Sequence, residues 1–333
     1  MAIQTKISES PDDEWNIRLL NSRYSTIHQT VDYTEYIKAV NNMPSYYVTF
    51  HNNGQVLGQM VLHKISRLRK KLEPKLGDIP LFSKLLNLTK TIKPMYVWHF
   101  GPVIFNIDYK NEIFHEISKL RKTLNAPIYG SIHPLLERSI ELVENGWKER
   151  KTHTFLIDLS LTTEQLWNNI DRHSGRKAVK RAQNKQVIIK PIESLDDLKI
   201  HHQLLNEGME IAGLGTYPFV YIKKSWEMLK NVGQFGFIAW HGNYPLASTL
   251  VTTFNGYMNE WGFARSKYDR DNLLNGPDII KWHLIEWGHN NRFRIFDLTG
   301  VNPDSHNKKD QGIYKFKKKW GGQLREWYHY NIS

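Results

Sequence analysis

The pattern of hydrophobic and polar positions in the first part of the chain predicts two helices followed by a β-hairpin. Residues 14–42 have the spacing of two amphipathic helices, with the polar, turn-like segment SRYSTIHQT between them. Residues 45–50 and 55–65 then follow the pattern of strands. They flank Asn53-Gly54, a dipeptide typical of tight hairpin turns. We therefore expect the first sheet to begin with a hairpin.

The rest of the first half alternates between strands and helices. Residues 64–95 are basic and loop-like, apart from a short apolar helix expected around Leu81 to Leu88. Strands are predicted at 96–105 and 126–132, and helices at 111–125 and 134–147.

The second half follows a similar course. A strand is predicted at 154–161, and a helix begins after the capping-box pattern of Thr162 and Gln165. We expect this helix to continue through Ile170 into the basic segment 171–185. Further strands are predicted at 187–192, 234–240, 245–254, 257–266 and 293–300. Helices are predicted at 195–212, through Trp226 to Leu229 after the break GLGTYP, and at 276–288.

Two segments of the chain match each other in register. VTFHNNGQVLGQMVL (48–62) and IAWHGNYPLASTLVT (238–252) both run strand, His-x-Asn, turn, strand, so that His51 corresponds to His241. Residues 96–101 then parallel 257–262, and 128–134 parallel 295–303. This repeat predicts an α+β protein with mixed sheets in two tandem domains. We expect domains at 1–150 and 151–320, with 321–333 as a strand that returns to the first domain.

Composition narrows the class of protein. The chain has 333 residues, of which 40% are hydrophobic and 12% aromatic, enough for substantial cores. It has no cysteine, which excludes disulfides, thiolate metal sites and cysteine nucleophiles. The first 15 residues lack the features of a signal peptide, and no apolar run approaches the length of a membrane span. We expect a cytoplasmic protein.

The charge favours a polyanionic partner. Lys and Arg exceed Asp and Glu by 45 to 33, a formal charge of +12. In the predicted helix over 163–185, cations recur at spacings that place most of them on one broad face, where like charges repel one another. Because such a face has a stability cost, a phosphate-binding role becomes as plausible as a solvated surface. The residues concerned are Arg172, Arg176, Lys177, Lys180 and Arg181.

The segment from Phe296 to Gly322 carries the strongest candidate chemistry. Its apolar strand and polar loop lead into a run where Phe316, Lys317 and Trp320 alternate aromatic, cation, aromatic. A lysine beside aromatic rings suits a site that holds an anionic or carbonyl group. The alternative is a solvated basic segment at the end of a domain.

The element order is that of the GNAT acyltransferase fold. Ordinary members place a glycine-rich loop before a helix, and the amides of that loop cradle the pyrophosphate of coenzyme A. Here the loop 270–277 keeps one glycine followed by Pro277, which has no amide, and residues 107–116 in the first half have no glycine. The usual mode of coenzyme A binding is therefore disfavoured.

The sequence resembles the FemABX family of aminoacyltransferases, which are tandem GNAT-like proteins. The resemblance is clearest at FLIDLSLTTEQLWNNIDRHSGRKAVKRAQNKQV, LLNGPDIIKWHLIEWG and FDLTGVNPDSHNKKDQGIYKFKKKWGG. It implies the short type without a helical arm. It also implies transfer of an amino acid from aminoacyl-tRNA to an amine of a peptidoglycan precursor, with aminoacyl-tRNA as co-substrate and no other cofactor.

The resemblance also implies roles for individual residues. Lys317 matches the lysine that stabilises the tetrahedral oxyanion, and Phe316 packs beside it. His133-Pro134 stands where short members have Asp-Pro, so His133 is a candidate base or a structural residue. The cations around 172–181, with Lys315, Lys318 and Lys319, become a candidate tRNA cradle. On the acceptor side the candidates are Lys38, Tyr217 and Trp320.

The identity of the acceptor is not decided by the resemblance. Tyr217 stands at the position where a short member of the family has an arginine that contacts the nucleotide diphosphate of its precursor. A lipid-linked precursor with peripheral contact at the inner face of the membrane, a nucleotide-linked precursor and another amine are all compatible. A metal site is not expected, because His283 and His289 lie almost two turns apart on a predicted helix. The alternatives are a coenzyme A-dependent N-acyltransferase and a non-catalytic RNA-binding module.

Overall fold

The computed structural model describes residues 3–66, 94–211, 213 and 216–333. The chain divides into two compact units: residues up to Thr152 together with Glu326–Ser333 form the first, and His153–Arg325 form the second. The helix expected around Leu81 to Leu88, with most of the basic segment 64–95, lies outside the described residues.

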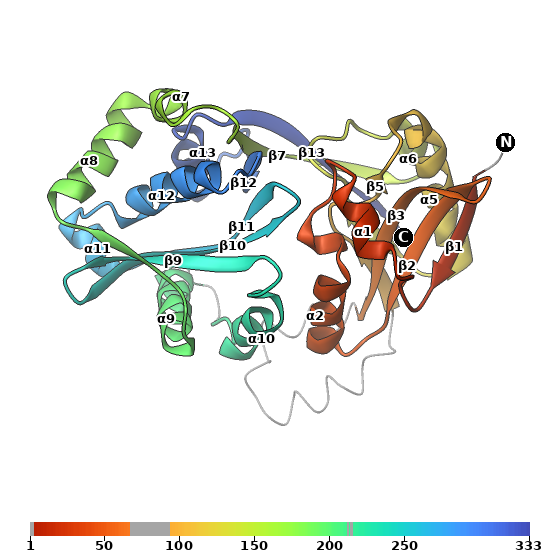
Figure 1. Cartoon of the computed structure of the whole chain (residues 1–333), viewed down its shortest axis with the longest axis horizontal. Coiled ribbons are helices and arrows are strands. Elements are labelled where there is room, and N and C mark those ends of the chain that lie inside the picture. The colour runs from red at the N-terminus through yellow and green to blue at the C-terminus, as the bar shows by residue number, and fades with distance from the viewer. Residues whose placement is uncertain (1–2, 67–93, 212, 214–215) are drawn as a thin grey trace. The chain divides into compact units, whose positions relative to one another are not determined.

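The first unit is built on a mixed sheet (Figure 1). Its hairpin turns at Asn53 and Gly54, whose φ values of 49° and 80° are those of the tight turn that the dipeptide predicts. The strands, in spatial order, are β1 (Gln4–Ser8), β2 (Ser45–Asn52), β3 (Gln55–Ser66), β4 (Pro94–Trp98), β6 (Ile128–Ser131) and β13 (Gln323–Ile332), with the short β5 (Val103–Ile104) beside β3. The α-helices are α1 (Trp15–Leu20), α2 (Val31–Asn41), α5 (Lys110–Leu124) and α6 (Ile140–Glu144), and short 3₁₀ turns span Ile27–Gln29 and Ile107–Tyr109.

The second unit repeats this plan. Its strands, in spatial order, are β8 (Ile188–Pro191), β9 (Gln234–His241), β10 (Tyr244–Phe254), β11 (Tyr257–Arg265), β12 (Ile295–Val301) and β7 (Lys148–Asp158). Its helices are α7 (Thr163–Asn169), a π-helical turn (Arg172–Arg176), α8 (Lys177–Asn184), α9 (Leu195–Ile211), α10 (Phe219–Leu229), α11 (Lys267–Asn272), α12 (Gly276–Asn290) and α13 (Lys308–Lys318). In Figure 1, α12 and α13 lie on one side of the sheet, and α9 and α10 lie on the other.

The order of pairing confirms a mixed α+β architecture. In the first unit the hairpin β2–β3 leads to β4, then to helix α5, and then to β6, which pairs parallel to β4. In the second unit β9–β10 leads to β11, α12 and β12, and β12 pairs parallel to β11. Each parallel pair thus has a helix in its crossover, as a parallel connection requires. The internal sequence repeat corresponds to this repeated unit.

The long helix predicted over 163–185 is interrupted. The capping box of Thr162 and Gln165 is present, but α7 ends at Asn169. The carboxylate of Asp171 then accepts the amides of His173 and Ser174 and so starts a new helical segment. The break precedes all five cations named for this region, so they lie together in the helical stretch that runs from the π-helical turn (Arg172–Arg176) into α8 (Lys177–Asn184).

Other differences arise from burial. The segment 22–30, predicted to be polar and turn-like, lies mostly inside the first unit. Gln29 makes this possible, because its carbonyl accepts the indole N–H of Trp15 at 2.8 Å and its side chain accepts the amide of Val61 at 3.1 Å.

The helix predicted over 134–147 is limited to Ile140–Glu144, where Ser139 caps it.

Candidate functional site

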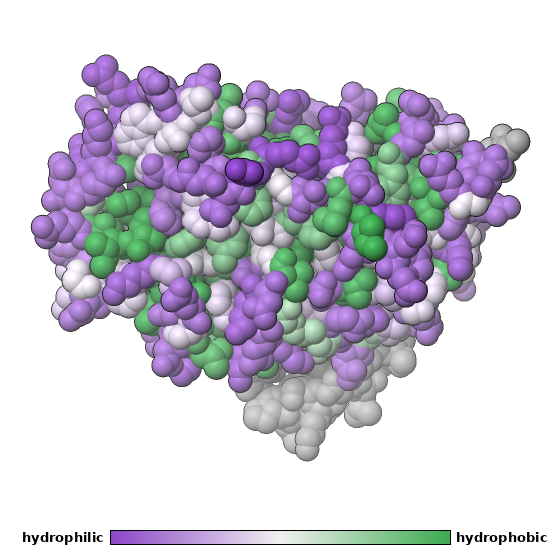
Figure 2. Space-filling model, viewed as in Figure 1, coloured by the Kyte–Doolittle hydropathy of each residue, from purple (hydrophilic) through white to green (hydrophobic). Residues whose placement is uncertain are grey.

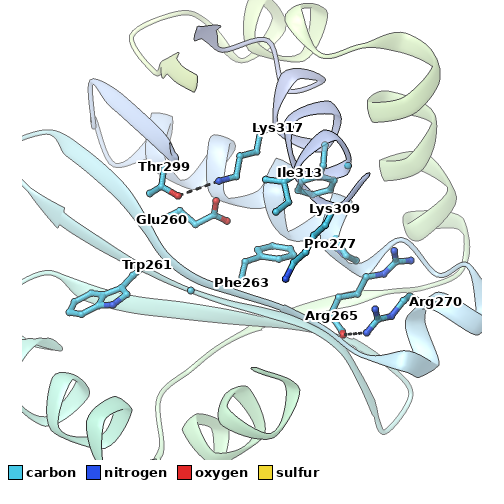
Figure 3. A pocket seen from close by; sticks show the side chains of 13 residues that line it. Glu260, Trp261, Phe263, Arg265, Arg270, Pro277, Thr299, Lys309, Ile313 and Lys317 are labelled. Carbon is cyan, nitrogen blue, oxygen red and sulfur yellow. Dashed lines mark hydrogen bonds between the residues drawn. The ribbon is translucent and has the colours of Figure 1, made fainter. Parts of the chain in front are cut away.

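The second unit contains a cavity of about 660 Å³ between the end of the sheet and α13 (Figure 3). Strand β11, the start of α12, the end of β12 and one face of α13 all contribute to its wall. The lining residues are Glu260, Trp261, Gly262, Phe263, Arg265, Arg270, Pro277, Thr299, Lys309, Gly312, Ile313, Phe316 and Lys317.

A β-bulge shapes the floor of this cavity. In the pairing of β10 with β11, Leu250 lies opposite Gly262 and Val251 opposite Glu260, so Trp261 is an extra residue in β11. Bulges twist a strand locally and re-aim its side chains. Consecutive residues of β11 from Glu260 to Phe263 therefore all reach the cavity wall.

Thr299, at the end of β12, has a strained backbone. Its φ of 61° is unusual for a β-branched residue. The amide of Thr299 donates to Asp297 Oδ1 at 2.7 Å, and its carbonyl accepts from Thr154 Oγ1 at 2.9 Å. Asp297 is buried and also accepts from the hydroxyl of Tyr257 at 2.6 Å. These bonds hold a conformation that costs of the order of 1–3 kcal/mol.

Lys317 extends from α13 to this strained segment. Its Nζ donates to Thr299 Oγ1 and to the carbonyl of Gly300, both at 3.3 Å. Within the described part of the chain, Lys317 forms no ion pair with a carboxylate, whereas nearby Lys281 and Lys319 each have one. Lys317 therefore presents a positive charge to the cavity that no carboxylate neutralises directly.

The segment of alternating aromatics and cations is a helix, α13. Asn307 begins it, because its side chain accepts the amide of Lys309 at 2.8 Å. Helical spacing places Lys309, Ile313, Phe316 and Lys317 on one face. All four line the cavity, so the mixture of cations and apolar side chains in this run belongs to one helical face that forms the cavity wall.

Trp320 is not placed as an acceptor contact requires. It is only 1% exposed and belongs to the core of the second unit, beside Phe316 at 6.1 Å between ring centroids. Such a buried ring offers no free face for stacking. The expected acceptor role of Trp320 is therefore corrected to a packing role, while Phe316 does line the cavity.

The first turn of α12 is occupied by side chains and backbone of the second unit. The Gly276 amide donates to Asp269 Oδ1 at 2.7 Å, and the Asp278 and Ile279 amides donate to the Asn275 carbonyl at 3.0 and 3.2 Å. Pro277 has no amide to offer. Asp278 lies in the same turn and pairs with Lys319. A negatively charged phosphate would meet two carboxylates here instead of free N–H groups.

The predicted tRNA-binding residues divide by exposure. Arg176 is half-buried and donates to Asn168 Oδ1 at 3.1 Å, and Lys319 is engaged by Asp278. The remaining cations are exposed: Arg172, Lys177, Lys180, Arg181, Lys315 and Lys318. A second cavity, of about 650 Å³, is lined by residues 169, 171 and 174 together with 315, 316, 318 and 319. It brings the tail lysines next to the segment that carries Arg172.

The remaining predicted residues lie elsewhere. His133, in the first unit, is fully buried, and its Nδ1 accepts the amide of Leu135 at 3.1 Å. Burial, with a smaller contribution from Arg23, lowers the pKa of His133 to about 3. A neutral imidazole bonded to the backbone suits a structural role.

Lys38 and Tyr217, the other acceptor candidates, are at the surface of different units. Lys38 lies on α2 in the first unit, where it pairs with Glu35 at 2.7 Å and lies 5.7 Å from the ring centroid of Tyr47. Tyr217 is 40% exposed in the second unit, and its amide donates to Asn206 Oδ1 at 2.8 Å.

Three further observations describe the surroundings of the site. In the described residues, no group of three or more metal-ligating side chains is arranged to hold a metal ion, and the His289 ring instead bonds to the Leu159 carbonyl at 3.0 Å. None of the described helices combines the length and apolarity that crossing a membrane requires. The face in Figure 2 is mostly hydrophilic, with smaller hydrophobic areas between the polar side chains.

Sequence reasoning missed the buried pair of Glu260 and Lys281. Lys281 is completely buried within α12 and pairs with Glu260 on β11. Its desolvation lowers its pKa, and the Glu260 carboxylate opposes that shift. A signal was present, because a lysine within the apolar run IIKWHLI of a helix that packs on a sheet requires a buried partner.

The fold matches solved structures over nearly the whole chain. The crystal structure of FemX superposes with a TM-score of 0.71 at 13% identity, covering 97% of this chain and 96% of FemX. A tandem GNAT protein from the clavulanic acid biosynthesis pathway gives 0.55 at 12% identity, covering 99% and 98%.

A third structure is the C-terminal domain of a putative lysylphosphatidylglycerol synthetase from Agrobacterium fabrum. It gives a TM-score of 0.54 at 10% identity, covering 95% of this chain and 92% of that domain. No protein-family model matches the sequence, and no curated protein matches it. At such identities the similarity establishes the fold alone: two tandem GNAT-like domains with mixed sheets.

Proposed function

We propose that the protein is an aminoacyltransferase that moves an amino acid from aminoacyl-tRNA to an amine. The observation that carries this proposal is the position of Lys317. Its ammonium group lies at the cavity wall and is held by Thr299 and Gly300, and no carboxylate of the described residues forms an ion pair with it. A cation held in this way is suited to a reaction in which negative charge develops on a carbonyl oxygen.

The chemistry is aminolysis of an ester. The acceptor amine attacks the aminoacyl carbonyl, a tetrahedral oxyanion forms, and the 3′-oxygen of tRNA leaves as the new amide bond is completed. The Lys317 ammonium donates a charge-assisted hydrogen bond to the oxyanion, and a single donor of this kind contributes about 3 kcal/mol to transition-state stabilisation. Phe316 and Phe263 line the same cavity, with ring centroids 5.9 Å apart, and form an apolar surface beside the lysine.

Two features support tRNA as the donor. The exposed cations on α8 and on α13 offer several contacts to phosphates, which dominate the affinity of nucleic-acid binding. The α12 N-terminus, by contrast, has its amides engaged and carries Asp269 and Asp278, so it is poorly suited to the pyrophosphate of coenzyme A. The likeness to FemX supports the same choice.

For the acceptor we propose the side-chain amine of a cell-wall precursor peptide. A nucleotide-linked precursor, a lipid-linked precursor and a related amine are to be compared directly. The similarity to a putative lysylphosphatidylglycerol synthetase makes phosphatidylglycerol a useful additional acceptor in the same assay, with its hydroxyl as the nucleophile.

The test is a transfer assay with charged tRNAs and these acceptors, comparing the wild type with two matched variants. Lys317→Met should reduce kcat by about 100-fold. Lys308→Met is the control, because Lys308 is an exposed lysine on the same helix outside the cavity lining, and it should retain wild-type activity.

Three outcomes would contradict the proposal. Unchanged turnover in Lys317→Met would remove that residue from the reaction. Saturable binding of acetyl-coenzyme A together with transfer of its acetyl group would favour the N-acyltransferase alternative. Binding of tRNA with no dependence on the aminoacyl group, and no transfer, would favour a non-catalytic RNA-binding module.

A further inference from the structure

Among the described residues that line the 660 Å³ cavity, Glu260 is the single acid; the others are cations, apolar residues and Thr299. Glu260 is 8% exposed, yet it contributes to the cavity wall together with Lys317 and Thr299. In Figure 3 its carboxylate points toward the side of the cavity where these two residues lie. A carboxylate in such a place is costly to desolvate, so its partners indicate what it does.

One partner is provided by the protein. Lys281 Nζ donates to Glu260 Oε1, and it lies 5.2 Å from the ring centroids of both Phe263 and Phe296. Among the hydrogen bonds and ion pairs of the described residues, the Glu260 carboxylate takes part through Oε1 with Lys281, and none involves its other oxygen, Oε2. Lys281 thus fixes the orientation of the carboxylate and leaves one oxygen for a ligand.

The neighbouring charges define that ligand. A carboxylate oxygen accepts hydrogen bonds and favours a cation, whereas the Lys317 ammonium donates and favours a carbonyl oxygen or an anion. Both groups line one cavity, so the complementary ligand carries an ammonium group close to a carbonyl group. An α-aminoacyl ester has this arrangement, because a single carbon separates its ammonium nitrogen from its carbonyl carbon.

We propose that Glu260 binds the free α-ammonium group of the aminoacyl donor and thereby selects donors whose α-amino group is unmodified. This inference rests on the proposed function, whose site it specifies further. Lys281 acts as a positioning residue for Glu260, while Lys317 contacts the carbonyl oxygen. The apolar part of the wall, formed by Trp261, Phe263 and Ile313, then faces the amino-acid side chain.

The probe for a direct binding test is puromycin. It carries an aminoacyl group with a free α-ammonium on the 3′-nitrogen of a nucleoside, and its amide bond resists transfer. Its methoxyphenyl side chain also suits the apolar wall. N-acetylpuromycin is the matched ligand without the positive charge. Calorimetry at pH 6.5 keeps the α-amino group mostly protonated, since such groups have pKa values of about 7.7–8.0.

The wild type should bind puromycin about 10- to 100-fold more tightly than N-acetylpuromycin, as expected for a hydrogen bond to a charged group. In Glu260→Gln this ratio should fall close to one, while the glutamine oxygen still accepts from Lys281. Glu286→Gln, a half-buried glutamate on α12 outside the cavity lining, should keep the wild-type ratio. Circular dichroism checks that both variants are folded.

Equal affinities for the two ligands in the wild type, or binding of neither, would overturn the inference without reference to any variant. A ratio that persists in Glu260→Gln would remove Glu260 from ammonium recognition. Failure of the proposed function is distinguishable from these results. In that case puromycin would still be discriminated, but no charged tRNA would support transfer to any acceptor.

Discussion

Lys317 Nζ lies 3.3 Å from Oγ1 of Thr299, whose backbone φ is 61°. Lys317, which lines the cavity, is thus held by a residue in a strained conformation. Asp297 and Thr154 maintain this conformation through bonds to the amide and carbonyl of Thr299. Strain of this kind is often found where a side chain must be positioned for function.

Substitutions at Thr299 should separate stability from activity. Thr299→Ala and Thr299→Gly both remove the hydroxyl that accepts from Lys317, so we expect each to lower kcat by about 3- to 10-fold, the equivalent of one hydrogen bond. Glycine adopts positive φ without steric penalty, so Thr299→Gly should be more stable than Thr299→Ala by about 1 kcal/mol. Urea unfolding and the transfer assay measure the two effects. A less stable glycine variant would contradict the assignment of strain.

Asp269 should be essential for the start of α12. It is fully buried, accepts the Gly276 amide at 2.7 Å and accepts from Arg265 Nε at 2.6 Å. Asp269→Ala leaves the buried amide without this acceptor, and we expect it to destabilise the protein by about 2–4 kcal/mol in urea unfolding. Asp269→Asn retains an oxygen for the amide and should be less destabilising. Equal losses in the two variants would show that the Gly276 bond is unimportant.

The lysines at the end of α13 should differ in role. Lys318 is exposed, whereas Lys319 pairs with Asp278 and the two side chains are 13% and 11% exposed. Lys318→Met should lower the slope of log affinity for tRNA against log salt by about 0.7–0.9, with unfolding unchanged. Lys319→Met should instead destabilise the fold by about 3 kcal/mol, because it leaves Asp278 buried without its partner.

A double-mutant cycle provides the control for Lys319. The substitution Asp278→Asn removes the stranded charge, so Lys319→Met combined with Asp278→Asn should be more stable than Lys319→Met alone. Additive losses in the double variant would contradict the coupling of the two residues.

Acidification should destabilise the first unit. Burial lowers the pKa of His63 and of His133 to about 3, and that of His329 to about 4. Below pH 6.5 the unfolded chain protonates these residues while the folded chain does not. Stability should therefore be independent of these groups above pH 6.5 and fall on acidification below it. The loss approaches about 1.4 kcal/mol per pH unit for each group until the folded-state pKa is reached.

Urea unfolding between pH 7 and 4.5 measures this effect. In His133→Asn the amide oxygen can still accept from the Leu135 amide, but the titrating ring is gone. The slope of the unfolding free energy against pH should then decrease by about 1.4 kcal/mol per pH unit, which corresponds to one proton fewer taken up on unfolding. An unchanged slope in this variant would show that His133 is protonated in the fold or stays unprotonated in the unfolded chain.

Local patterns in the sequence were sufficient for many elements of the fold. Asn53-Gly54 predicted a turn that its φ values confirm, and Thr162 with Gln165 predicted a capping box that is present. The internal repeat predicted two copies of one strand–helix plan, and the fold is a tandem GNAT-like one. These signals depend on neighbours close in the chain, on the alternation of strands or on a repeated order. A single sequence contains all of them.

The helix break and the long-range pairing and burial of side chains could be recognised only in the tertiary structure. The helix break at Asp171, the burial of Trp320 and the pairing of Lys319 with Asp278 each depend on contacts between residues distant in sequence or on a cap that competes with a helix. The sequence predicted that the run around Phe316, Lys317 and Trp320 carries the candidate chemistry, and the family resemblance pointed to Lys317 within it. Only the structure distinguished this lysine from Lys281 and Lys319, because long-range pairing and burial determine which charges are neutralised and which face a ligand.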